Sequence, residues 1–194
     1  MNHSDHVRLL AGGISTGGGL WADLGSGSGA FTLALADLLG PKGVIYSVDR
    51  DAAALREQER VMQARFPAVH VHYIPADYTR PLDLPPLDGI VMANTLHFLR
   101  DKEQLLRTLK SYLRPVGSDA PGIEHRRAVG LSPPAGGHFI LVEYDTDHGN
   151  MWVPHPISFR TWQATAQRVG FSEPKLITRV PSRFLGGIYG AVSE

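Results

Sequence analysis

The 194-residue chain contains no cysteine. Disulfides, thiolate nucleophiles and cysteine-ligated zinc are therefore excluded. An excess of either charge is also missing, because 19 Lys and Arg side chains balance 19 Asp and Glu side chains, so net charge does not draw the protein to nucleic acid or to an anionic membrane. We find neither an apolar run of about 18 residues nor a secretory leader, and we expect a cytoplasmic protein that does not enter membranes.

The length predicts a single domain over residues 1–194. Apolar runs at about 20–24, 43–48, 69–74, 87–93 and 138–144 alternate with segments of helical spacing. Nearly continuous apolar strands that alternate with helices indicate an α/β fold, with a parallel sheet covered by helices on both faces. Two further strand-like runs, near 174–180 and 184–192, follow a helix that begins near Phe159.

Two segments depart from this alternation. Residues 1–19 form a short glycine-rich lead-in, with one or two helical turns expected around His6 to Leu10. Residues 116–135 are rich in Gly and Pro and show no periodicity. Loops of this length are usually functional or disordered, and we expect a disordered or poorly ordered insertion there.

A glycine-rich turn follows the first apolar run and opens the next helix. It reads Asp23-Leu24-Gly25-Ser26-Gly27-Ser28-Gly29. Glycine permits a sharp turn and a close ligand approach, and a helix N-terminus favours polar or anionic groups. The turn therefore predicts a nucleotide-like cofactor. Gly25, Gly27 and Ala30 also satisfy the dinucleotide pattern, so a nicotinamide or flavin cofactor remains open at this point.

Polar residues end the next three strands. Asp49 and Arg50 follow the second strand, Asp77 and Tyr78 the third, and Asn94 the fourth. Because the carboxyl ends of parallel strands meet at one edge of a sheet, these residues should line one crevice. Asp49, Asp77 and Asn94 each have a structural alternative, since a strand-end Asp can cap the following helix or turn and Asn94 can be a turn residue.

This ordered set of motifs resembles the class I S-adenosylmethionine-dependent methyltransferases over nearly the whole chain. The resemblance implies a Rossmann-like, seven-stranded, mostly parallel sheet with a C-terminal antiparallel strand pair. It implies S-adenosyl-L-methionine as cofactor, with Asp49 on the ribose hydroxyls and Asp77 on the adenine amino group. The residues expected to hold the cofactor are Asp23, Gly25, Ser26, Gly27, Gly29, Asp49, Arg50, Asp77, Tyr78 and Asn94.

Candidates for the acceptor side follow the fourth and fifth strands. His97 could take a proton from the acceptor, contact it without proton transfer, or simply pack in the fold. Tyr144, His148, Trp152 and His155 are expected to bind the substrate. Asp145, Asp147 and His148 invite comparison with metal-dependent enzymes, but no fourth ligand is evident and we expect no metal.

The expected function is methyl transfer to a small-molecule acceptor. After the fourth strand the chain reads Asn94-Thr95-Leu96-His97, where enzymes that methylate DNA amino groups carry an Asn/Asp-Pro-Pro-aromatic signature. Two alternatives remain: a non-catalytic module that binds S-adenosylmethionine and a protein partner, and an NAD(P)-dependent oxidoreductase. Against the second, the chain has no Tyr-x-x-x-Lys pair. The sequence leaves the oligomeric state open.

Overall fold

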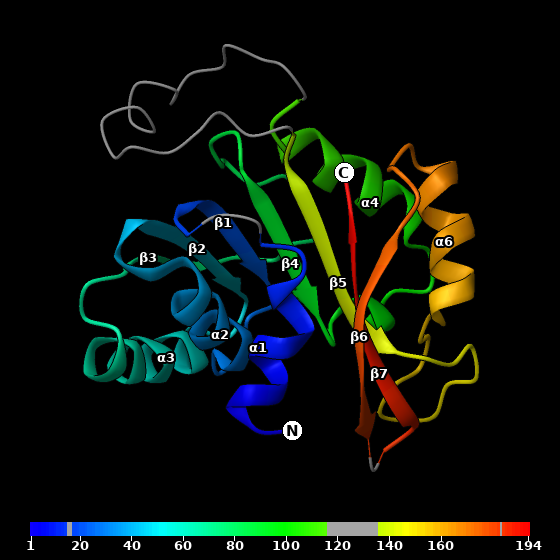
Figure 1. The fold of residues 1–194 in the computed structure, drawn as a ribbon, viewed down its shortest axis with the longest axis horizontal. Helices are drawn as coiled ribbons and strands as arrows, with labels where there is room; N and C mark the ends of the chain where they lie inside the picture. Colours follow the sequence, from blue (N-terminus) through cyan, green and yellow to red (C-terminus); the bar gives the residue numbers. More distant parts are fainter. Residues whose placement is uncertain (15–16, 116–135, 183) are drawn as a thin grey trace.

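The computed structural model describes residues 1–14, 17–115, 136–182 and 184–194. Seven strands form one sheet in the order β3-β2-β1-β4-β5-β7-β6 (Figure 1). The first five pair in parallel, whereas β7 lies antiparallel to both β5 and β6. In chain order the strands are β1 Gly19–Leu24, β2 Gly43–Asp49, β3 His70–Pro75, β4 Gly89–Ala93, β5 His138–Tyr144, β6 Lys175–Ser182 and β7 Gly186–Ser193. The α/β class with a mostly parallel seven-stranded sheet is confirmed.

The expected strands agree with the observed ones to within two residues at either end. The agreement is complete for β5, which is buried almost along its full length, whereas β4 begins at Gly89, two residues later than expected. A strand covered on both faces must be apolar at nearly every position, which makes its ends visible in the sequence.

The described residues form five α-helices and two short 3₁₀ turns. They are α1 His3–Ala11, α2 Ala30–Leu39, η1 Gly40–Lys42, α3 Ala52–Arg65, η2 Leu96–Phe98, α4 Glu103–Tyr112 and α6 Phe159–Arg168. Of these, α1 precedes β1 and the others lie between strands.

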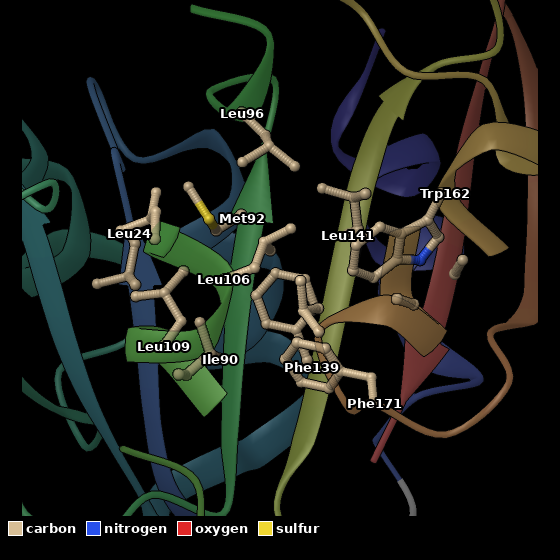
Figure 2. Packing of buried hydrophobic residues seen from close by; sticks show 14 of the residues in the cluster. Leu24, Ile90, Met92, Leu96, Leu106, Leu109, Phe139, Leu141, Trp162 and Phe171 are labelled. Atoms are coloured by element: carbon tan, nitrogen blue, oxygen red, sulfur yellow. The ribbon is translucent and has the colours of Figure 1, made fainter. Parts of the chain in front are cut away.

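Successive residues of the central strands pack into two different apolar layers. Met92 of β4 belongs to a cluster with Leu106 of α4 and Trp162 of α6 (Figure 2). Its neighbour Val91 belongs to a second cluster, which includes Leu35 of α2. Side chains alternate between the faces of a strand, so each layer covers one face of the sheet.

Helix α1 is longer than the one or two turns expected in the lead-in. Asn2 and Asp5 form a capping box: the Asp5 N–H donates to Asn2 Oδ1 at 2.9 Å, and the Asn2 N–H donates to Asp5 Oδ2 at 3.2 Å. Leu9 and Leu10 are fully buried. The cap satisfies helix N–H groups that otherwise lack partners, and burial of the two leucines stabilises the remaining turns.

The expected insertion at 116–135 lies outside the described residues. No helix in the described ranges is long and apolar enough to cross a membrane.

Candidate functional site

A pocket of about 570 Å³ lies at the carboxyl ends of the parallel strands. It is lined by seven of the ten residues expected to hold a cofactor: Gly25, Gly27, Asp49, Arg50, Asp77, Tyr78 and Asn94. Thr95, Phe98 and Leu99, which follow β4, complete one side of it. The structure therefore brings together residues from four separate strand ends, as parallel strands in one sheet require.

The glycine turn lines the pocket with its backbone. Gly25 and Gly27 have φ values of +77° and +54°, in the left-handed region that favours glycine. A Cβ on Gly25 would lie 2.5 Å from Thr95 Cγ2. A Cβ on Gly27 would meet no atom within 4 Å, so it would project into open space. Because Gly27 lines the pocket, a side chain at this position would occupy space that a ligand needs.

Asp49 holds the glycine turn from the neighbouring strand. Its Oδ2 accepts a hydrogen bond from the Gly27 N–H, and its Oδ1 accepts one from the Asp51 N–H, both at 2.8 Å. Asp51, rather than Asp49, caps helix α3. Each carboxylate oxygen can accept more than one hydrogen bond. Asp49 can therefore hold the turn and still accept a pair of ligand hydroxyls.

Asp77 combines a structural contact with a position in the pocket. Its Oδ1 accepts from the Thr79 hydroxyl at 2.7 Å and from the Thr79 N–H at 2.9 Å. The hydroxyl and then the N–H hold the pKa of Asp77 below its ordinary value. Oδ2 accepts no hydrogen bond from the described residues, which leaves it free for a ligand donor. The adjacent Tyr78 donates its hydroxyl to the Thr95 carbonyl at 3.1 Å.

Asn94 carries backbone strain at the end of β4. Within the described ranges it is the single non-glycine residue with positive φ, at 55°. Its Oδ1 is buried and has no hydrogen-bond partner. A buried acceptor without a donor costs about 1–3 kcal/mol. Asn94 lines the pocket, so a ligand N–H or O–H group would remove that cost if the side chain turned Oδ1 toward the pocket.

Asp23, Ser26 and Gly29 lie behind the pocket wall rather than in its lining. Asp23 is 1% exposed and accepts from the Thr32 hydroxyl at 2.6 Å. Burial raises the pKa of Asp23 to about 7; the Thr32 hydrogen bond opposes that rise and the Asp49 charge adds to it. The Ser26 hydroxyl lies 2.7 Å from Ser47 Oγ. Direct contact of these three residues with a cofactor stays a prediction.

His97 forms a buried pair with Glu143, which the sequence analysis missed. His97 is 3% exposed, and its Nδ1 lies 2.9 Å from both carboxylate oxygens of Glu143. The His97 backbone N–H also donates to Glu143 Oε2 at 3.1 Å. His97 is not among the residues that line the pocket, although the next residue, Phe98, is. The signal for Glu143 was a carboxylate in an otherwise apolar strand.

Two of the expected substrate residues lie next to His97. The Tyr144 ring centroid is 6.0 Å from that of His97, and the His155 N–H donates to the His97 carbonyl at 3.0 Å. His148 is exposed and Trp152 is 70% exposed. None of these four residues belongs to the lining of the 570 Å³ pocket. Their contact with a substrate stays a prediction.

The carboxylates after β5 hold the start of helix α6. Asp145 accepts from the Phe159 N–H at 2.9 Å and from Arg179 Nε at 2.7 Å. Asp147 accepts from the Ser158 N–H at 2.9 Å and from the hydroxyls of Ser158 and Thr161 at 2.8 Å. In the part of the chain that the structure describes, no group of three His, Asp or Glu side chains is arranged to hold a metal ion.

The sequence and the fold were compared with known proteins. Residues 22–118 match the family described as "Methyltransferase domain". A 97-residue stretch is 33% identical to the 2-phytyl-1,4-naphtoquinone methyltransferase of Trichormus variabilis, covering 48% of this chain and 41% of that protein. The chain thus spans less than half the length of this curated relative.

Two solved structures illustrate the shared fold. One is the Burkholderia thailandensis 1,6-didemethyltoxoflavin-N1-methyltransferase with bound 1,6-didemethyltoxoflavin and S-adenosylhomocysteine: TM-score 0.69, 14% identity, 98% of this chain and 76% of that chain. The other is a SAM-dependent methyltransferase from Aquifex aeolicus: TM-score 0.60, 17% identity, 100% of this chain and 98% of that chain.

Proposed function

The chain belongs to the methyltransferase domain family, and from this premise we propose that it transfers a methyl group from S-adenosylmethionine to a small-molecule acceptor. The observation that carries the proposal is the convergence of Gly27, Asp49 and Asn94 on one pocket. The related proteins add support, since one is named for a naphthoquinone and another holds a small heterocycle with S-adenosylhomocysteine.

The pocket residues fit the chemical groups of this cofactor. Asp49 offers carboxylate oxygens to the two ribose hydroxyls, and Asp77 Oδ2 offers an acceptor to the adenine amino group. The unpartnered Oδ1 of Asn94 suits the N–H donors of the amino-acid end. The open space above Gly27 lets the ligand approach the backbone. Three kinds of donor on the cofactor would thus find three acceptors on the protein.

Methyl transfer from this cofactor then requires little bond making or bond breaking by groups of the protein. When bound, S-adenosylmethionine supplies a methyl group on a positively charged sulfur that needs no further activation. The chain contributes binding and orientation, which place donor and acceptor in line. Phe98 and Leu99 border the pocket on the β4 side with apolar side chains.

For the acceptor side we propose the surface around His97, Tyr144 and His155, with Trp152 and His148 on the same loop. Glu143 orients the His97 ring through Nδ1, so Nε2 is the nitrogen that an acceptor hydroxyl would have to reach. His97 is 3% exposed in the structure and would have to become accessible to an acceptor for this role. His97→Asn would test this role, and Glu143→Gln would test the orientation. A lost general base lowers turnover about 10²- to 10⁴-fold. Unchanged turnover in a folded His97→Asn variant would leave His97 with a packing role.

Equilibrium binding separates the cofactor hypotheses. Calorimetry should give saturable binding of S-adenosylhomocysteine and none of NAD. Binding of NAD alone would contradict the proposed function. Transfer of a labelled methyl group, first to 2-phytyl-1,4-naphthoquinone and 1,6-didemethyltoxoflavin, then tests turnover. Measurable transfer to either acceptor would eliminate the non-catalytic binding module.

A further inference from the structure

A chain of polar side chains runs beneath the glycine turn. It links Asp23 of β1, Thr32 of α2, Gln58 of α3, Ser47 of β2 and Ser26 of the turn. Thr32 Oγ1 lies 2.6 Å from Asp23 Oδ2, Ser47 Oγ lies 2.7 Å from both Gln58 Oε1 and Ser26 Oγ, and Gln58 Nε2 contacts Thr32 Oγ1. Thr32, Gln58 and Ser47 are fully buried. Polar groups in such a place are stable because each has a partner.

The chemistry of the five groups determines which of them donates and which accepts in each hydrogen bond. The Gln58 carbonyl oxygen can only accept, so Ser47 donates its one proton to it, and the Ser26 hydroxyl must donate to Ser47. At the other end, the Gln58 amide donates to Thr32, whose proton goes to Asp23. When Asp23 is ionised, a reversed amide would require the single Thr32 proton to serve Gln58 and Asp23 together. In that state all donors point from the glycine turn toward Asp23.

Gln58 occupies the middle of the chain and is fitted closely to the turn. A Cβ on Gly29 would lie 2.4 Å from Gln58 Cγ. Gly29 thus leaves room for the Gln58 side chain, whereas Gly27 leaves room for the pocket. Gln58 does not line the pocket itself. Its contacts reach the pocket through Ser47 and Ser26.

Ser26 is the residue that connects this series of polar side chains to the backbone that lines the pocket. It lies between Gly25 and Gly27, whose backbones line the pocket. Glycine has more backbone freedom to lose than any other residue, and it has no side chain with which to anchor itself. The Ser26 hydroxyl supplies an anchor on the side of the turn away from the ligand.

We propose that Gln58 is a positioning residue for cofactor binding: through Ser47 it holds Ser26, and thereby keeps the Gly25–Gly27 backbone in its ligand-binding conformation. The inference rests on the proposed cofactor pocket. It adds a residue on α3 that does not line the pocket and that none of the sequence motifs includes.

A double-mutant cycle tests this role with S-adenosylhomocysteine as the probe. We expect Gln58→Leu and Ser26→Ala each to weaken binding roughly 2- to 10-fold, the equivalent of one neutral hydrogen bond. If Gln58 acts through Ser26, the two losses should not add. The double variant should then bind S-adenosylhomocysteine with about the affinity of whichever single variant binds it less tightly. Thr165→Val, which removes a buried hydroxyl from α6, is the matched control and should leave affinity unchanged. Affinity losses that multiply in the double variant would overturn the proposal.

Conservative substitutions and hydrogen exchange keep the test decisive if Gln58→Leu does not fold. Thr32→Ser keeps the hydroxyl and should retain affinity, whereas Thr32→Val should reproduce the loss. Without ligand, amide exchange at Gly27 and Gly29 should accelerate in Ser26→Ala and Thr32→Val but not in Thr165→Val. Unchanged exchange would refute the positioning role even if the wild-type protein binds S-adenosylhomocysteine. Failure of the wild-type protein to bind it would instead refute the proposed cofactor.

Discussion

Replacement of Asp23 by Asn should change how the stability of the protein depends on pH. Asp23 is 1% exposed, and its pKa is raised to about 7, first by burial and further by the negative charge of Asp49. The hydrogen bond from Thr32 at 2.6 Å offsets only part of that effect. In the unfolded chain the same carboxyl group titrates near pH 3.9.

The direction of this pH dependence follows from the number of protons bound by the folded protein and by the unfolded chain. Between about pH 4 and pH 7 the folded protein holds a proton on Asp23 that the unfolded chain has released. The free energy of unfolding should therefore decrease as pH rises through this window and level off above pH 7. The difference between the two pKa values corresponds to roughly 4 kcal/mol.

Urea denaturation at several pH values between 4.5 and 8 measures the effect. We expect the stability difference between Asp23→Asn and the wild-type protein to grow in favour of the variant as pH rises to 7. Asp83→Asn, at an exposed position, controls for the loss of a carboxylate elsewhere. A stability difference that stays constant from pH 4.5 to 8 would show that Asp23 titrates normally and that its environment has been misjudged.

Four further changes test the pocket and the insertion. Asp49→Ala removes a charged acceptor and should weaken S-adenosylhomocysteine binding roughly 10- to 150-fold by calorimetry; unchanged affinity in a folded variant would exclude its role. Gly27→Val should abolish that binding yet keep a cooperative melt, since its side chain would enter the pocket; normal binding would contradict the assignment of the turn. Asn94→Gly relieves a left-handed backbone and should raise the melting temperature by a few degrees while binding weakens; equal affinity would remove the role of Oδ1. Replacing residues 116–135 with Gly-Gly should shift the melting temperature by only a few degrees, and a large loss would show that the segment supports the core.

The sequence alone determined the strands and the approximate place of the pocket. β5 is buried along almost its whole length, so its apolar run marks both of its ends, and the apolar run of β4 marks the end of that strand at Ala93. Parallel strands end at one edge, and for this reason Asp49, Asp77 and Asn94 could be assigned to one pocket without knowledge of their contacts. The glycine turn was readable because positive φ at Gly25 and Gly27 restricts the residue type.

Only the tertiary structure decided which polar side chains face the pocket and which lie behind it. His97 and Glu143 are 46 residues apart and meet because β4 and β5 are neighbours in the sheet. Gln58 shares the buried face of α3 with Leu55 and Met62, as helix spacing indicates, but its position against Gly29 and its polar partners follow only from the packing of α3 on the glycine turn. Asp23 and Asn94 both belong to strand ends, yet one is enclosed beneath the turn and the other lines the pocket. These outcomes depend on contacts between distant segments, which local composition and periodicity do not encode.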